Sequence, residues 1–440
     1  MIATEVNSFQ QQSAQFQQQQ LATSPNWLRD LRRRGLDRFV QLGIPTTREE
    51  DWRLTNLAFL AGRPFEITSP DLTATFGVEE LVQRATLDED FHRLVFVNGH
   101  YADQWSTHHE LPAGTVVENL STSIRNSSEA TGKRLGLQAE DEQTSFVALN
   151  AAFLHDGARI DVPADTVVER AIHLIFLAVG EGQTAQHPRN LITLAKNSRA
   201  TVIESYFGGE GEDYFTNAVT EVELAEAADL DHHKLQHEER SAVHLATTQI
   251  HQQAHSRFRS HYFSFGGSIA RNELNCVLDG EKIECTLNGL YMPKGDQLMD
   301  CRTRIDHTKP HCNSYEMYKC ILDDRARGVF NGKIFVHQDA QKTDAKQSNQ
   351  SLLLSDDAII NTKPQLEIYA DDVRCTHGAT IGELDEQAIY YLRSRGIPAD
   401  LARTMLIFAF ANDVVQGVEV PAVRKHLEAV LLSDRGLPDV

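Results

Sequence analysis

The sequence predicts a mainly β protein whose strand-rich centre is flanked by helical regions, and three observations predict this fold class. Convincing amphipathic helices nearly disappear between Gly157 and Val373, where short strand-like runs alternate with Gly, Asn and Asp. Over two hundred residues of strands without intervening helices indicate one all-β unit. A sandwich or barrel of that length would be unusually large, whereas a parallel solenoid grows by adding rungs, so the pattern favours a solenoid.

The N-terminal segment is rich in glutamine. Eight of the eleven residues from Gln10 to Gln20 are glutamine, a composition that gives a chain segment little reason to pack. The composition therefore predicts a disordered tail over residues 1–24, which we leave out of the predicted fold.

Residues 25–155 are expected to form a mainly helical region with one small hairpin. Apolar residues recur at helical intervals after Pro25 until Gly43 breaks the pattern. The Asn98-Gly99 pair is typical of a tight hairpin turn between two strands. Two further helices are expected over residues 46–60 and 141–154.

The solenoid is expected over residues 156–380 and a C-terminal helical domain over residues 381–440. Three helices are predicted in that domain, over residues 385–395, 400–415 and 420–432. The middle helix is nearly apolar from Met405 to Ala411. A helix so apolar must be buried, either in a small bundle of its own or against a partner.

Charge and composition exclude several classes of function. The chain has 440 residues, and its 42 Lys and Arg against 62 Asp and Glu give a net charge of −20. Such an acidic chain is a poor match for nucleic acid or for an anionic membrane surface, because both need clustered cations. No apolar stretch reaches the ~20 residues of a membrane helix, and no secretory signal is visible. We therefore expect a cytoplasmic protein.

The six cysteines all follow residue 275, and they are Cys276, Cys285, Cys301, Cys312, Cys320 and Cys375. Without an export signal they are expected to be reduced thiols, and no Cys-x-x-Cys motif suggests a zinc ribbon or a redox pair. We expect the first five to pack mostly inside the solenoid, because a free cysteine most often behaves as a small, buried apolar residue.

Familiar catalytic motifs are absent. The stretch from Gly328 to Lys333 resembles a phosphate loop, but it has one residue too few between its glycines and no Ser or Thr after the lysine. Gly-x-Ser-x-Gly and His-Glu-x-x-His do not occur. Histidines four apart, such as His233 and His237, would lie about 13 Å from each other on a strand, too far to share a metal.

Cys375-Thr-His377 is the sharpest local arrangement. On an extended strand these two side chains project from one face with their Cα atoms roughly 7 Å apart. A thiolate and an imidazole suit a thiophilic metal such as iron, although two ligands are too few for a closed site. Either another chain supplies the remaining ligands, or Cys375 is simply buried and His377 faces solvent.

Residues 310–415 carry a long resemblance to a known family. The stretch from Asn313 to Val336, which contains Tyr-Lys-Cys-Ile-Leu-Asp-Asp-Arg-Ala-Arg-Gly, and the run from Gln338 to Gln350 resemble the SufB/SufD family of iron-sulfur cluster assembly proteins. The likeness continues through Asn361-Thr-Lys-Pro364 and the Cys375-Thr-His-Gly-Ala-Thr380 run. Within the family, Glu49-Glu-Asp-Trp-Arg53 and the glycine after His377 are more similar to the SufD branch than to SufB.

The resemblance implies a right-handed parallel β-helix between helical regions, which agrees with the pattern above. It implies a non-catalytic scaffold, active in iron-sulfur cluster assembly and the stress response, that pairs with a SufB-like paralogue through the β-helix. It also implies that the C-terminal helices dock a SufC-like ABC ATPase, with Leu401, Met405, Phe408 and Val415 as the contacting residues. His377 and Cys375 would be metal ligands for a transient iron or nascent cluster at the paralogue interface, with no tightly bound cofactor.

Two alternatives stay open at this point. A β-helix carbohydrate-active enzyme would need grouped acids, for which the aspartate pairs beginning at Asp323, Asp356 and Asp371 could be nominated, although paired aspartates are common in turns. The second alternative is a SufB-like scaffold, alone or as a homodimer, that carries a cluster unaided. The iron donor, the cluster type and any sulfur-relay role of the five other cysteines are not set by the sequence.

Overall fold

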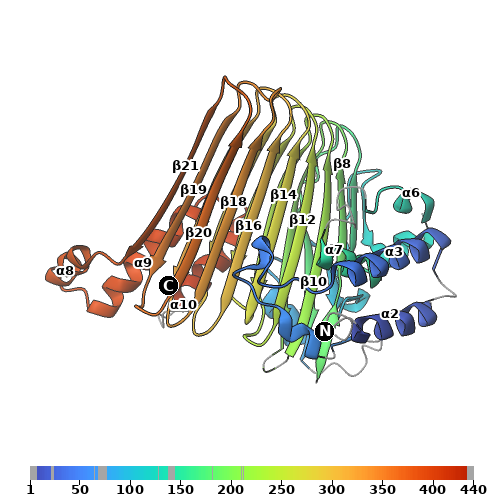
Figure 1. Ribbon diagram of the computed structural model, residues 1–440, viewed down its shortest axis with the longest axis horizontal. Coiled ribbons are helices and arrows are strands. Elements are labelled where there is room, and N and C mark those ends of the chain that lie inside the picture. Colours follow the sequence, from blue (N-terminus) through green and yellow to red (C-terminus); the bar gives the residue numbers. More distant parts are fainter. Residues whose placement is uncertain are drawn as a thin grey trace.

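The computed structural model shows a long two-sheet parallel solenoid with helices at its N-terminal end and along one side of its C-terminal end (Figure 1). The structure describes residues 7–20, 24–63, 65–67, 77–126, 128–136, 144–180, 182–209, 211 and 213–433. The predicted fold class, mainly β with a parallel solenoid between helical regions, is confirmed.

The chain alternates between the two sheets, so that each rung contributes one strand to each. The first sheet contains β4 (Val116–Asn119), β5 (Ala158–Val162), β8 (Arg189–Leu194), β10 (Asp213–Leu224), β12 (Val243–Gln252), β14 (Ile269–Leu278), β16 (Leu298–His307), β18 (Arg327–Val336) and β20 (Ile359–Ile368), with β1 (Glu66–Ile67) and β7 (Gln183–Gln186) at its side. The second sheet contains β3 (His100–Tyr101), β2 (His92–Val97), β6 (Ile172–Ala178), β9 (Arg199–Gly208), β11 (Asp229–His237), β13 (Arg257–Ser264), β15 (Glu284–Tyr291), β17 (Asn313–Leu322), β19 (Asp344–Leu353) and β21 (Arg374–Glu383). We call these the even sheet and the odd sheet.

Equivalent residues stack in columns from rung to rung. In the even sheet Ile250, Cys276, Ile305 and Ile334 lie in direct register on successive strands, and all four are buried. Because side chains alternate between the two faces of a strand, one face of each sheet builds the core between the sheets. These columns explain why the strands have apolar runs but no strict sequence repeat. Each position in a column requires a buried apolar side chain that fits its neighbours, and more than one residue type meets that requirement.

The N-terminal region covers the first rungs. It contains α2 (Asn7–Gln20), α3 (Asn26–Leu42), the 3₁₀ helices η1 (Glu50–Trp52) and η2 (Ala58–Gly62), α4 (Val78–Ala85), η4 (Asp103–Trp105), α5 (Leu120–Asn126), α6 (Ser128–Gly132) and α7 (Ser145–Ala152). Helices α3 and α7 cross closely at Gly35, where a Cβ would lie 2.7 Å from the carbonyl oxygen of Ala148. The Asn98-Gly99 hairpin joins β2 and β3, with φ values of 52° and 79°.

The prediction of a disordered tail over residues 1–24 is wrong for Asn7–Gln20, which form α2. Phe9 and Phe16 are two helical turns apart, and both are buried against the N-terminal core. The ring of Phe9 meets Phe39 at 5.4 Å and that of Phe16 meets Phe153 at 5.8 Å. Two aromatic anchors on one helical face outweigh the polar composition. Residues 1–6 and 21–23 of that predicted tail lie outside the described residues.

The single helix expected over residues 46–60 is replaced by η1 and η2. Thr55 lies between these two short helices and contacts the even sheet, where its hydroxyl donates to Asp300 Oδ2 at 2.6 Å. Just before η1, Glu49 Oε1 accepts from the backbone N–H of Thr46 at 2.8 Å.

The C-terminal domain consists of α8 (Glu386–Ser394), α9 (Ala399–Val415) and α10 (Pro421–Ser433), close to the three predicted ranges. Helices α9 and α10 lie along the outer face of the odd sheet, whereas α8 projects away from the solenoid (Figure 1). None of the described helices is both long and apolar enough to cross a membrane.

Candidate functional site at the last rung

The last rung, made of β20 and β21, ends the solenoid with an open edge. Each of these strands is the terminal strand of its sheet, so one of its backbone edges has no neighbouring strand in the described part of the chain. Most residues of β21 are exposed, and four large apolar side chains in or next to the two strands are widely accessible, namely Ile359, Ile368, Tyr369 and Ile381. Pro364 sits within β20, a position that an edge strand tolerates because the missing N–H breaks no ladder. A flat ten-residue edge left open in this way is a ready template for another chain.

Cys375 and His377 both lie on β21, as the resemblance requires. They stand on the inner face of the strand, in register with Ala345 and Gln347 of β19. Cys375 is half-buried against the apolar cluster that contains Ile334, and this burial raises the pKa of its thiol. His377 is exposed at the open end. A thiol and an imidazole, two groups able to bind iron, therefore lie near each other on the rung.

The described residues contain no group of three or more His, Cys, Asp or Glu side chains that could hold a metal ion. Cys375 and His377 supply two donor atoms at most, which is fewer than a closed iron or zinc site uses. The shortage is a feature of an open edge, since a second chain placed against β21 could add its own ligands.

The five remaining cysteines are buried in the core between the sheets, which confirms the expected packing. Burial raises the pKa of Cys276, Cys301 and Cys320 well above the ordinary range. A thiol held in its protonated form is a weak nucleophile and a weak ligand.

The other histidines are held in separate places. His233 stacks on His261 at 4.9 Å inside the odd sheet, while His307 bonds to the hydroxyl of Ser314 at 3.0 Å. His232 pairs with the buried Glu204 at 2.9 Å. Burial alone would raise the pKa of that carboxyl, but the histidine partner holds it at about 2. His232 and His307 face the core between the sheets, whereas His233 and His261 are buried on the outer face of the odd sheet, where a Cβ at Gly417 would lie 3.8 Å from the His261 ring.

The predicted docking residues divide into two groups. Met405 is exposed and Leu401 and Phe408 are half-buried on α9. Val415 is fully buried, because the apolar side of α9 packs on this chain's own odd sheet against Leu290 and its neighbours. Val415 is therefore not available to a partner. The surface that covers the apolar side of the helix is the odd sheet of this same chain.

Sequence reasoning missed the most exposed aromatic residues of the C-terminal domain. Tyr390 and Tyr391 on α8 are 74% and 57% exposed. An ion pair between Arg403 and Glu386 at 3.5 Å links α8 to α9. Two adjacent tyrosines in this short helix were a sequence signal for an exposed contact surface. Only Ile389 of α8 is buried, so the tyrosines do not contribute to a core.

Lys319 anchors α9 to the solenoid. Its ammonium projects outward from β17, is almost fully buried, and donates to Asp413 at 2.7 Å and to the carbonyl of Phe410 at 2.9 Å. It also lies 4.4 Å from the centre of the Phe410 ring. The strand–helix contact is therefore tied by a charge as well as by apolar packing.

The Glu49-Glu-Asp-Trp-Arg53 element attaches the N-terminal region to the even sheet. Glu50 pairs with Lys363 of β20 at 2.5 Å, and Asp51 pairs with Arg302 of β16 at 2.8 Å. The Arg271 guanidinium lies 3.6 Å from the centre of the Trp52 ring. A groove of about 780 Å³ runs beside these contacts. This element has a structural role that the sequence alone did not reveal.

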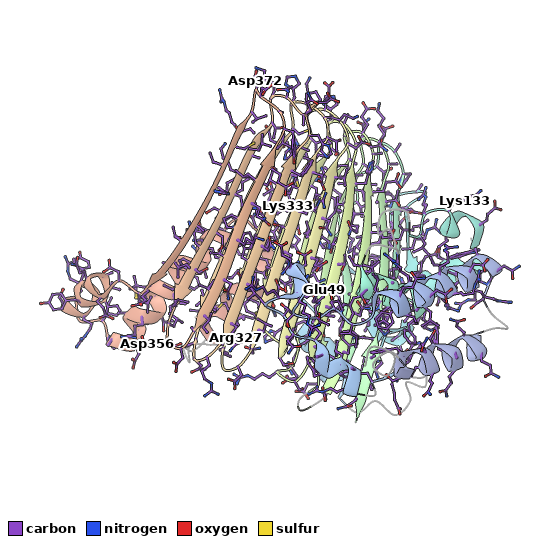
Figure 2. The ribbon with its side chains drawn as sticks, viewed as in Figure 1. Glu49, Lys133, Arg327, Lys333, Asp356 and Asp372 are labelled. Atoms are coloured by element: carbon purple, nitrogen blue, oxygen red, sulfur yellow. The ribbon has the colours of Figure 1, made fainter. Side chains whose placement is uncertain are left out.

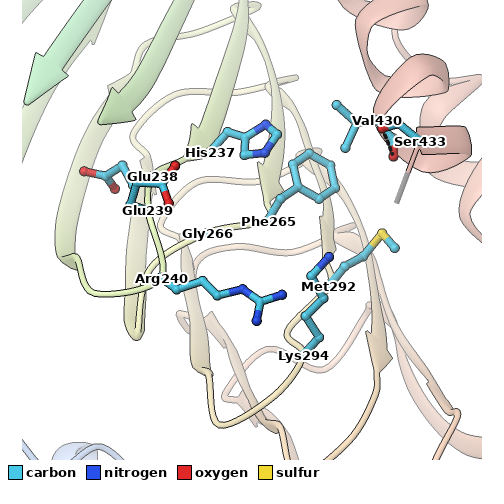
Figure 3. Close-up of a pocket in the computed structure, with 10 residues that line it drawn as sticks. All are labelled: His237, Glu238, Glu239, Arg240, Phe265, Gly266, Met292, Lys294, Val430 and Ser433. Atoms are coloured by element: carbon cyan, nitrogen blue, oxygen red, sulfur yellow. Dashed lines mark hydrogen bonds between the residues drawn. The ribbon is translucent and has the colours of Figure 1, made fainter. Parts of the chain in front are cut away.

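A smaller cavity of about 190 Å³ lies between the rung turns and α10 (Figure 3). His237, Arg240 and Lys294 point toward it from the turns, and Val430 and Ser433 close it from the helix. Glu238, which also lines it, is fixed by His244 at 2.7 Å, so the cavity offers no free carboxylate from that residue.

The aspartate pairs do not form a catalytic groove. Asp324 has a φ of 55°, as in a turn, and its backbone N–H donates to Asp323 Oδ1 at 3.0 Å. Asp356 and Asp372 lie at opposite edges of the solenoid (Figure 2). Acids so far apart cannot flank one glycosidic bond.

Comparisons with known proteins agree with this geometry. The family model for the SufBD core domain of the SUF system of FeS cluster assembly matches residues 176–410, and the model for the SufBD protein N-terminal region matches residues 5–174. An iron-sulfur cluster assembly SufBD family protein of Synechocystis is 33% identical over 421 residues, covering 92% of this chain and 90% of that protein. The iron-sulfur cluster assembly protein SufD of Escherichia coli is 32% identical over 399 residues, covering 90% of each. SufD of Bacillus subtilis is 25% identical over 426 residues, covering 92% and 94%.

Proposed function

Because this chain belongs to the SufBD family of iron-sulfur cluster assembly proteins, we propose that it acts in the cytoplasm as a SufD-like, non-catalytic scaffold subunit. In this proposal the last rung pairs with a SufB-like paralogue, and the C-terminal helices dock a SufC-like ATPase. Iron and sulfide are assembled as cargo at the rung that the two paralogues share. Six free thiols without a disulfide support a reducing compartment.

One observation carries the proposal: His377 stands exposed on the terminal strand, beside Cys375, on an edge that lacks a neighbour. A neutral imidazole is a suitable ligand for iron. A single nitrogen ligand from this chain, completed by thiolates from the paralogue, would bind a nascent cluster without enclosing it. A cluster held at a shared edge can leave when the edge opens.

The ATPase is proposed to act on this edge through α9. Its docking surface would be the exposed side of α8 and α9, formed by Tyr390, Tyr391, Leu401, Met405 and the exposed part of Phe408. The buried side of α9 packs on β17, which is the third strand of the odd sheet when counted from the open edge at β21. A movement of the ATPase would thus reach the rungs that carry the ligand.

The experiment is anaerobic cluster reconstitution on the complex of this chain with the paralogue and the ATPase. Replacing His377 by Ala is expected to lower the bound iron and sulfide severalfold. The control is His337→Ala, which removes an exposed histidine outside β21 and should change neither quantity. Unchanged iron and sulfide in the His377→Ala complex would contradict the ligand proposal. A stable visible chromophore on the isolated chain would instead favour a stand-alone scaffold.

A further inference from the structure

The inner face of the last three rungs carries a line of polar side chains that leads to His377. Glu316 of β17, Gln347 of β19 and His377 of β21 are in direct register. Neighbouring strands lie roughly 4.8 Å apart, so each residue is one strand spacing from the next. Glu316 and Gln347 are buried, and only His377 reaches the open end. The column therefore connects the interior with the proposed ligand.

Glu316 holds the side chain of Gln347 in one orientation. Gln347 Nε2 donates to Glu316 Oε2 at 2.6 Å. The amide reaches across the core to Gly332 of β18, where an added Cβ would lie 2.2 Å from Nε2. Only a residue without a side chain leaves this space, which gives Gly332 a role that the failed phosphate-loop motif did not suggest. With Nε2 used by the carboxylate, the amide oxygen is left for another partner.

That oxygen is buried and has no hydrogen-bond partner in the described part of the chain. An unsatisfied buried acceptor costs about 1–3 kcal/mol, so such groups normally have a donor in the working state of a protein. The next residue in the column is His377, which lies on the same inner face at the exposed end and whose ring N–H is a donor. Metal-ligating histidines almost always donate their second ring nitrogen to an oxygen in this way.

We propose that Gln347, held by Glu316, is a positioning residue for His377: its amide oxygen accepts the inward ring N–H of His377 and leaves the other ring nitrogen's lone pair directed to the shared edge. This inference rests on the proposed function of His377 as a ligand. The contact closes when a partner covers the last rung and orders the imidazole. The imidazole is then fixed in one tautomer before iron arrives, which removes an ordering cost from iron binding.

The test is the tautomer of His377, measured by nitrogen-15 NMR on the sedimented, iron-free complex in which only this chain carries labelled histidine. The His377 signals are assigned by their loss in His377→Gln. One tautomer is expected in the unsubstituted complex, and a mixture of two in Gln347→Leu. The control Gln350→Leu changes a glutamine on the outer face of the same strand and should keep one tautomer. Glu316→Gln keeps an oxygen acceptor for the amide and should largely keep it as well.

A second variant guards against a folding defect in Gln347→Leu. Gly332→Ala leaves Gln347 in place but displaces its amide, and it should also give two tautomers. The iron affinity of the complex should fall about 10- to 100-fold in both variants, as is typical when a supporting hydrogen bond is lost. A single unchanged tautomer in Gln347→Leu and Gly332→Ala, or a mixture in the unsubstituted complex, would overturn the inference. If the tautomer responds but His377→Ala keeps its iron, the positioning contact stands and the ligand proposal fails.

Discussion

The buried carboxyl of Glu316 makes a quantitative prediction about pH. Burial raises its pKa from 4.5 to about 7, although hydrogen bonds with Thr303 and Gln347 oppose the shift. Because the folded state holds the proton of Glu316 more tightly than the unfolded state, the contribution of this carboxyl to stability is greatest below pH 4.5 and falls as pH rises through 7. A rise in the pKa of Glu316 from 4.5 to about 7 corresponds to about 3 kcal/mol, which is lost once the pH is well above 7.

Glu316→Gln removes this titration while keeping an oxygen that can accept from Gln347. The difference in unfolding free energy between the variant and the unsubstituted chain should therefore move by about 3 kcal/mol in favour of the variant from pH 4.5 to pH 8. If the chain unfolds as one unit, its unfolding entropy of roughly 0.9 kcal/mol per kelvin converts this to about 3 °C in Tm. Thermal unfolding followed by circular dichroism at a series of pH values measures the difference.

The control for this experiment is Glu281→Gln, which makes the same chemical change at an exposed glutamate in a turn. A pH-independent difference for Glu316→Gln would refute the reasoning, because it would mean that the folded and unfolded states bind the proton of Glu316 equally well.

Two further predictions concern the C-terminal domain. Lys319→Met keeps the aliphatic stem but removes the charge-assisted hydrogen bonds to Asp413 and Phe410. Loss of these bonds should destabilise the docked helix by about 1.5–3 kcal/mol, so amide hydrogen exchange in α9 should become about ten- to a hundredfold faster. The control Lys346→Met, at an exposed site, should leave the exchange rates of α9 unchanged. Equal exchange in both variants would show that Lys319 does not anchor the helix. Tyr390→Ala together with Tyr391→Ala should abolish co-purification of the ATPase while pairing with the paralogue persists, since both side chains project into solvent and serve no core. Retained ATPase binding would place the docking surface elsewhere.

The architecture was largely predictable because local pattern and global fold agree over most of the chain. Short apolar runs between Gly, Asn and Asp reappear as the strands and turns of the solenoid, and the three C-terminal helices begin and end close to their predicted bounds. The prediction of disorder was wrong for Asn7–Gln20 because it considered the composition of the segment and not the positions of its apolar residues. Phe9 and Phe16 lie on one helical face, and that spacing was present in the sequence.

The candidate site was predictable only in part. The spacing of Cys375 and His377 on one strand face follows from an extended chain, but their place at the open edge depends on how many rungs the solenoid has. Val415 was assigned to a partner because an apolar helix gives no sign of which surface covers it; here the odd sheet does. Gln347 and Glu316 lie 30 and 61 residues before His377 in the chain, so only the register of three strands brings them into one column.

The most direct test of the central claim is pulsed electron paramagnetic resonance on the reduced cluster of the assembled complex, with nitrogen-15 histidine in this chain alone. If His377 binds the nascent cluster, a nitrogen-15 coupling to the cluster will appear, and it will disappear in His377→Ala while the control His337→Ala retains it. A cluster that shows no nitrogen coupling from this chain would contradict the account.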